Sequence, residues 1–175
     1  MDKYIYFAAE MPMLKWSEAP FMSLPAFMDE ARKWMNDADY RALIHAVLFH
    51  YDDTKGTGIY RSYLAFEHAL RQELAAYRKS RQEGFEYKFR DIPPNLVREG
   101  NPLEVEKKLL QYRWNWLEDQ EFGHYSDLDF FILYYLKLQI LHQLSLYEEE
   151  AGKKAFRVLV EQAQEANAEK TEKPL

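Results

Sequence analysis

The sequence predicts an all-α protein that folds as a single domain of about six helices around one long buried helix. Apolar residues recur at helical spacing along most of the chain. The segment 129–141 (DFFILYYLKLQIL) is apolar on every side of any helix drawn through it. A chain of 175 residues, 47% of them hydrophobic, can bury one substantial core. We place the domain at residues 1–168 and expect residues 169–175 to form a frayed polar tail.

The N-terminal part of the chain predicts short elements. Residues 4–16 are expected to form an irregular or short extended segment, because Pro12 stops any helix there. Ser23 can then cap a helix that carries Pro25 in its first turn and runs to about residue 36.

The middle of the chain contains the clearest amphipathic pattern. Asp37 or Asp39 begins the second helix, and residues 51–58 (YDDTKGTG) have the composition of a loop. A long amphipathic helix follows over residues 59–81. Its apolar stripe contains Ile59, Tyr63, Phe66, Leu70, Leu74 and Tyr77.

A strong helix start signal follows an ambiguous stretch. Residues 83–100 alternate aromatic and charged side chains around a proline pair, which predicts a short strand or an extended strap. Asn101 then serves as N-cap, Pro102 occupies the first helical position, and Glu104 reaches back to complete a capping box. This helix is expected to run to about residue 119.

The C-terminal third contains the long buried helix. Gly123 breaks the preceding helix, and Ser126 caps the long one, which runs to about residue 148. A turn at Gly152 leads to a last helix that ends near residue 167. The long helix is too short for a membrane span, because polar residues interrupt its apolar run well before the roughly 20 residues that a bilayer requires.

The helix over residues 102–119 has two apolar stripes. The first contains Leu103, Leu110, Trp114 and Leu117, and the second contains Val105, Leu109, Tyr112 and Trp116. Glu106 and Arg113 lie between the stripes and are predicted to form a buried ion pair that needs further hydrogen-bonded partners. The second stripe either faces a partner protein or belongs to one core in which the helix is wedged between two neighbours. The second alternative is favoured, because large exposed apolar patches are rare in monomers.

The composition excludes several classes of chemistry. The chain has no cysteine, which removes disulfides, thiolate catalysis and cysteine-bound metals and fits a reducing compartment. A formal net charge of −6 disfavours a nucleic-acid partner. The sequence also lacks the phosphate-binding glycine motifs and the nucleophile elbow of hydrolases. We therefore predict a protein that is not an enzyme and has no cofactor.

A metal site is weakly indicated. Glu121 and His124 form the chain's Glu-x-x-His element, but Gly123 interrupts the helix that would orient it, whereas a di-metal bundle needs two such elements. Asp127 and Asp129 are expected to be capping carboxylates. We predict no bound metal, and keep a carboxylate-bridged metal enzyme as the least favoured function.

Aromatic and methionine side chains supply candidate partner contacts, because these residue types are enriched at interfaces. One group lies in the segment WSEAPFMSLPAFM, and the other is the second stripe of the 102–119 helix. The candidates are Trp16, Phe21, Met22, Val105, Tyr112 and Trp116.

Three stretches carry a resemblance to a known family: YIYFAAEMPML, NPLEVEKKLLQYRWNWLE and DLDFFILYYLKLQILHQLSLYEEEAGKKAFRVLVE. They resemble a bacterial family of uncharacterised function that is encoded with the subunits of V-type ATP synthases. That family is distantly similar to the shaft-holding component of V-type ATPases, an all-helical protein that sits on the membrane rotor ring and holds the central shaft. The shaft-holding component is built from three similar helical units, and this chain is too short for that arrangement.

The resemblance implies a non-catalytic structural or coupling component of a V-type ATP synthase. The expected partners are other subunits of the complex, at the rotor ring or central stalk, with a homodimer as a further option. The expected location is the cytoplasm, peripheral at the inner membrane through the ATPase. The alternative function is a free-standing helical adaptor or assembly chaperone.

Overall fold

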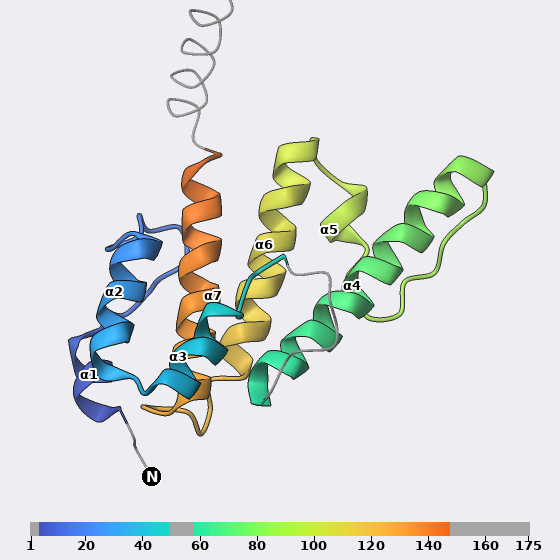
Figure 1. The fold of residues 1–175 in the computed structure, drawn as a ribbon. Helices are drawn as coiled ribbons and strands as arrows, with labels where there is room; N and C mark the ends of the chain where they lie inside the picture. Colours follow the sequence, from blue (N-terminus) through green and yellow to red (C-terminus); the bar gives the residue numbers. More distant parts are fainter. Residues whose placement is uncertain (1–3, 50–57, 148–175) are drawn as a thin grey trace, which may run out of the picture.

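The computed structural model describes residues 4–49 and 58–147 (Figure 1). All regular elements in these residues are helices, which confirms the predicted all-α class. The helices are α1 (Ile5–Glu10), α2 (Leu24–Trp34), α3 (Asp37–Ile44), α4 (Gly58–Glu83), α5 (Asn95–Arg98), α6 (Pro102–Asp119) and α7 (Leu128–Ser145). The predicted last helix, the polar tail and almost all of the predicted loop at 51–58 lie outside the described residues.

The expectation of an irregular N-terminal segment was wrong for residues 5–10, which form helix α1. The helix ends at its C-cap Met11, directly before Pro12. Phe7 explains why so short a helix is stable: it is fully buried, and its ring stacks on that of Phe131 with 4.2 Å between centroids. Tertiary packing therefore stabilises a helix that local propensity alone does not predict.

Helix caps were predicted with mixed success. Ser23 caps α2, and its hydroxyl accepts a hydrogen bond from the backbone N–H of Ala26 at 3.2 Å. Asn101 and Glu104 form the predicted capping box of α6. Two assignments were wrong by one residue, because Asn36 rather than an aspartate caps α3 and Asp127 rather than Ser126 caps α7. Both errors exchange one good cap residue for a neighbouring one, which propensity cannot distinguish.

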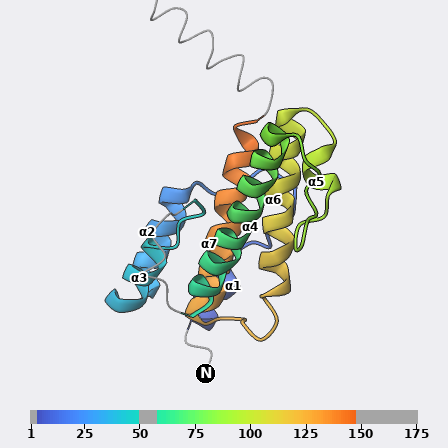
Figure 2. The same ribbon diagram turned by 90° about the vertical axis from the view of Figure 1, so that its right-hand side faces the viewer.

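Helix α7 lies at the centre of the fold, as predicted. It contacts α2, α3, α4 and α6, so that it is covered from several sides (Figures 1 and 2). Its most deeply buried side chains are Phe131, Ile132, Leu133, Leu136, Leu138 and Ile140. The apolar character of every side of this helix is therefore satisfied by protein neighbours.

The segment 84–94 is a strap rather than a strand, and a buried carboxylate holds it. Glu73 on α4 accepts hydrogen bonds from the backbone N–H groups of Arg90, Asp91 and Ile92. The bonds to Asp91 and Ile92 are both 3.1 Å long. Ile92 is thereby seated in a small apolar cluster with residues of α4 and α6.

Both stripes of α6 pack inside the protein. Trp114 and Leu117 of the first stripe are buried in the main core. In the second stripe, Trp116 stacks on Phe66 of α4 with 4.8 Å between ring centroids, and the Tyr112 hydroxyl donates to the Asp91 carbonyl oxygen at 3.0 Å. Helix α6 is thus wedged between α7 and the α4–strap unit, as in the favoured alternative.

The core position of the second stripe predicts a stability defect for Trp116→Ala. Removing this partly buried ring should lower the free energy of unfolding by about 2–3 kcal/mol, because it leaves a void against α4. The matched control is Phe21→Ala at a side chain that is 77% exposed, which should change stability by less than about 0.5 kcal/mol. Urea unfolding followed by circular dichroism measures both, and equal stability of the two variants would contradict the assignment.

Candidate functional site

The strongest polar interaction in the interior joins α4 to α6. Arg113 on α6 is 5% exposed and Glu67 on α4 is 2% exposed. Arg113 Nε donates to Glu67 Oε2 at 2.8 Å, and Nη2 donates to Oε1 at 3.0 Å. Arg71 adds a third bond, from its Nε to Glu67 Oε1 at 2.7 Å. This bidentate arrangement is the geometry in which a buried ion pair is best compensated for its desolvation.

This pairing corrects the expectation that Arg113 binds Glu106. Arg113 is buried as predicted, but its salt-bridge partner comes from α4. Glu106 is half-buried, two helical turns away, and acts on Arg113 only through its charge. Residues seven apart on one helix are about 10 Å apart along the axis, which is too far for a direct contact.

The electrostatics around Arg113 keep it charged. Burial by itself lowers the pKa of Arg113, but the hydrogen bonds and the negative charge of Glu67 outweigh burial, so that the pKa lies above its ordinary value. Nearby, burial and the charge of Glu67 raise the pKa of Tyr63. One guanidinium nitrogen of Arg113, Nη1, has no hydrogen-bond partner. The Arg113 guanidinium carbon lies 5.4 Å from the centre of the Phe49 ring, which places this cation against an aromatic surface.

A second buried cation ties α7 to the end of α6. Lys137 lies in the apolar face of α7, and its Nζ is 2.8 Å from Glu121 Oε1 and 3.5 Å from Glu118 Oε1. The ammonium group also lies 4.4 Å from the centre of the Trp114 ring. Lys137 is therefore held by two carboxylates and one aromatic face.

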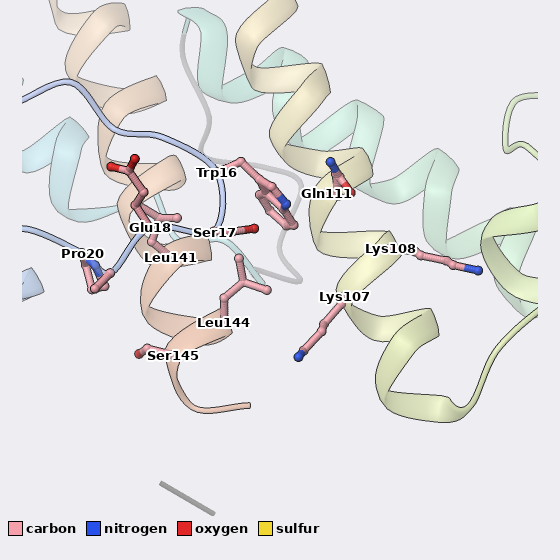
Figure 3. Close-up of a pocket in the computed structure, with 11 residues that line it drawn as sticks. Trp16, Ser17, Glu18, Pro20, Lys107, Lys108, Gln111, Leu141, Leu144 and Ser145 are labelled. Carbon is pink, nitrogen blue, oxygen red and sulfur yellow. The ribbon is translucent and has the colours of Figure 1, made fainter. Parts of the chain in front are cut away.

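Trp16 lines a surface cavity of about 290 Å³ between the loop at 16–20, α6 and α7 (Figure 3). The Trp16 ring is half-buried and meets that of Trp114 edge to face, with 5.7 Å between centroids. Lys108 points away from Trp16, and its Nζ donates to the Glu99 carbonyl oxygen at 3.0 Å. Trp16 is thus partly used in the protein's own packing.

The six candidate contact residues do not form one surface. Val105, Tyr112 and Trp116 pack between α4, the strap and α6. The Met22 carbonyl oxygen accepts a hydrogen bond from His142 Nε2 at 3.0 Å, and the Met22 side chain packs on the main core. Phe21 is the candidate whose side chain is largely exposed.

His124, Asp127 and Asp129 bring ligand atoms within 4.8 Å of one another. His124 Nδ1 bonds to Asp127 Oδ2 at 2.7 Å, and Asp127 Oδ1 accepts the N–H of Phe130 at 2.8 Å. Asp129 Oδ1 accepts the N–H of Ile59 at 3.3 Å. Both aspartates are therefore capping carboxylates, as the sequence indicated, and we interpret the cluster as structural.

Sequence reasoning did not identify the buried charges Glu67, Glu73 and Lys137. A signal existed for two of them. Glu67 falls at the helical spacing of the apolar stripe, four residues after Tyr63 and three before Leu70. Lys137 interrupts an otherwise apolar run. A charge at a core position of the periodic pattern indicates a buried, partnered group.

The Glu67–Arg113 pair predicts opposite results for two glutamate substitutions. Glu67→Gln should lower the free energy of unfolding by about 3 kcal/mol, because Arg113 remains buried without a counter-charge. Glu106→Gln removes the same charge from α6 and should cost less than about 0.5 kcal/mol. Chemical denaturation at pH 7 compares the two, and a larger cost for Glu106→Gln would contradict the assigned pairing.

Tyr134 predicts a loss of stability at alkaline pH. Its hydroxyl donates to the Pro12 carbonyl oxygen at 2.9 Å, and burial raises its pKa to about 12, against about 10 in an unfolded chain. The folded protein holds this proton more tightly, so the contribution is complete below pH 10 and is lost as pH rises through about 12.

The Tyr134→Phe variant lacks this titration and serves as the control. The stability advantage of the wild type over this variant should shrink between pH 10 and 12 by on the order of 1–2 kcal/mol, less than the full equivalent of the shift because the residue borders a solvent-open cavity. Urea unfolding at several pH values measures this difference. A constant difference would show that Tyr134 does not titrate in this range.

Comparisons with known proteins give one match. Residues 82–166 match the model of a family described as "Protein of unknown function (DUF2764)". The matched range includes the strap, α5, α6 and α7. The chain matches no curated protein and no solved structure. Within the described residues, none of the helices has the length and apolar character that a membrane span requires.

Proposed function

We propose that the protein is a non-catalytic structural or coupling component of a V-type ATP synthase, similar in role to the shaft-holding component, that acts through protein–protein contacts. The observation that carries the proposal is the use of its buried charges. Glu67 and Arg113 join α4 to α6, Glu73 joins α4 to the strap, and Lys137 joins α7 to the end of α6.

Such interactions favour a stiff body over a reactive one. A buried charge that is bound on several sides is costly to displace, so each of these groups resists relative movement of the elements that it joins. A part that transmits force or holds other subunits in place requires this kind of rigidity.

The resemblance to the ATP synthase-associated family supports the same proposal. Two of its three stretches form most of α6 and α7, which pack against each other through Trp114 and Lys137. In this proposal the protein is cytoplasmic and lies at the inner membrane through its partner complex.

Exposed apolar side chains supply contact surface. Tyr6 on α1 and Phe21 before α2 are largely exposed, and Trp34 at the end of α2 is 40% exposed. Large aromatic residues are enriched at protein–protein contacts.

Affinity purification of the full-length tagged chain from its native cells tests the proposal. Subunits of a V-type ATP synthase should be enriched at low ionic strength over a mock purification. Phe21→Ser should lower that enrichment by about tenfold if Phe21 is an anchor residue, whereas Arg81→Ser, at an exposed residue near the end of α4, should leave it unchanged.

The identity of the captured proteins decides between the alternatives. Purification without any rotary ATPase subunit would overturn the proposal. Reproducible capture of another complex would favour the free-standing adaptor or chaperone.

A further inference from the structure

A groove at the N-terminal end of α7 combines apolar walls with an acidic rim. We define the Met13 groove by Met11, Met13, Leu14, Phe130, Glu118 and Glu121, which line a cavity of about 340 Å³. It lies between the segment that follows α1, the end of α6 and the first turns of α7. The hydrogen bond from Tyr134 to the Pro12 carbonyl oxygen holds residues 11–14 against α7. One wall is therefore anchored to the most buried helix of the protein.

The apolar part of the groove is open to a partner. Met11, Leu14 and Phe130 are partly buried, whereas Met13 is 82% exposed. Phe122, which follows Glu121 directly in the chain, is 91% exposed. Methionine side chains are flexible and polarizable, and they adapt to apolar residues of different shape.

The rim of the groove carries more negative charge than its own helix favours. The carbonyl end of a helix is already partially negative, and basic residues usually occupy its last turn. Helix α6 instead ends with Glu118 and Asp119, has no basic residue in its last turn, and is followed by Glu121. Lys137 compensates part of this charge from below, and the side chains of Glu118 and Glu121 remain 49% and 40% exposed.

We propose that the Met13 groove is the docking site for a basic amphipathic segment of a partner protein. Apolar residues of that segment enter the groove between Met13, Leu14 and Phe130. Its lysine or arginine side chains pair with Glu118 and Glu121 at the rim and complement the carbonyl end of α6. The inference rests on the proposed function and deepens it by giving the chemistry of a partner contact.

The test uses peptides and needs no ATPase. The probe is a fluorescein-labelled amphipathic peptide of about 18 residues with leucine on one face and lysine on the other. One comparison peptide has glutamate in place of lysine, and another has serine in place of leucine. Fluorescence anisotropy with the full-length protein should give a dissociation constant for the leucine–lysine peptide about tenfold below those of both comparison peptides.

Matched variants separate the groove from general attraction to an acidic protein. Met13→Ser and Glu118→Gln should each weaken binding about threefold to tenfold, and Glu118→Gln leaves the Lys137–Glu121 bridge in place. The controls are Phe85→Ser and Glu83→Gln, which change exposed residues at and just after the far end of α4 (Figure 1). Each should change binding less than about twofold, and thermal melts establish that all four variants remain folded.

Three results would overturn the inference: equal binding of the lysine and glutamate peptides, equal effects of groove and control variants, or a concentration-dependent dimer in sedimentation that Met13→Ser abolishes. The last would assign the groove to a second copy of the chain. Selective peptide binding without co-purification of ATPase subunits would support the groove while rejecting the proposed function, and the reverse pattern would do the opposite.

Discussion

The fold depends on the need to cover α7. This helix has no continuous polar face, and in water its apolar side chains would cost more free energy than any local propensity could offset. Helices α2, α3, α4 and α6 all contact it. Phe7 on α1 adds an aromatic stack on Phe131, and Trp114 on α6 adds another large ring. The remaining helices are thus arranged around one requirement, which is to remove α7 from solvent on every side.

Buried charges then determine how the covering helices are aligned. Hydrophobic contact is non-directional and allows a helix to slide or rotate against its neighbour. A bidentate pair such as Glu67–Arg113 has one good geometry, and any other register leaves a charge buried without a partner. Glu73 has the same effect on the strap, whose three consecutive N–H groups it binds. The cost of burying these charges is offset only in the observed arrangement, which favours a single rigid structure.

The outer surface follows a different pattern from the interior. Inside, every buried charged side chain named above has a partner from another element. At the Met13 groove, exposed methionine and phenylalanine side chains lie beside carboxylates at the unfavourable end of α6. Such an uncompensated combination is more typical of a contact surface than of a solvated face. A protein that works by contact would require both parts, a stiff interior and a surface that a partner completes.

The sequence alone determined the helical class, most helix boundaries, the capping box at Asn101 and the burial of α7, because periodicity and cap chemistry are local properties of the chain. It also indicated that Arg113 would be buried. It did not determine that Arg113 binds Glu67, that Glu73 holds the strap, or that Phe7 makes α1 helical. These depend on contacts between residues that are distant in the sequence, and their partners become neighbours only once the helices have packed around α7. The same holds for Val105, Tyr112 and Trp116, whose stripe was compatible with a partner surface until the position of α4 and the strap placed it in the core.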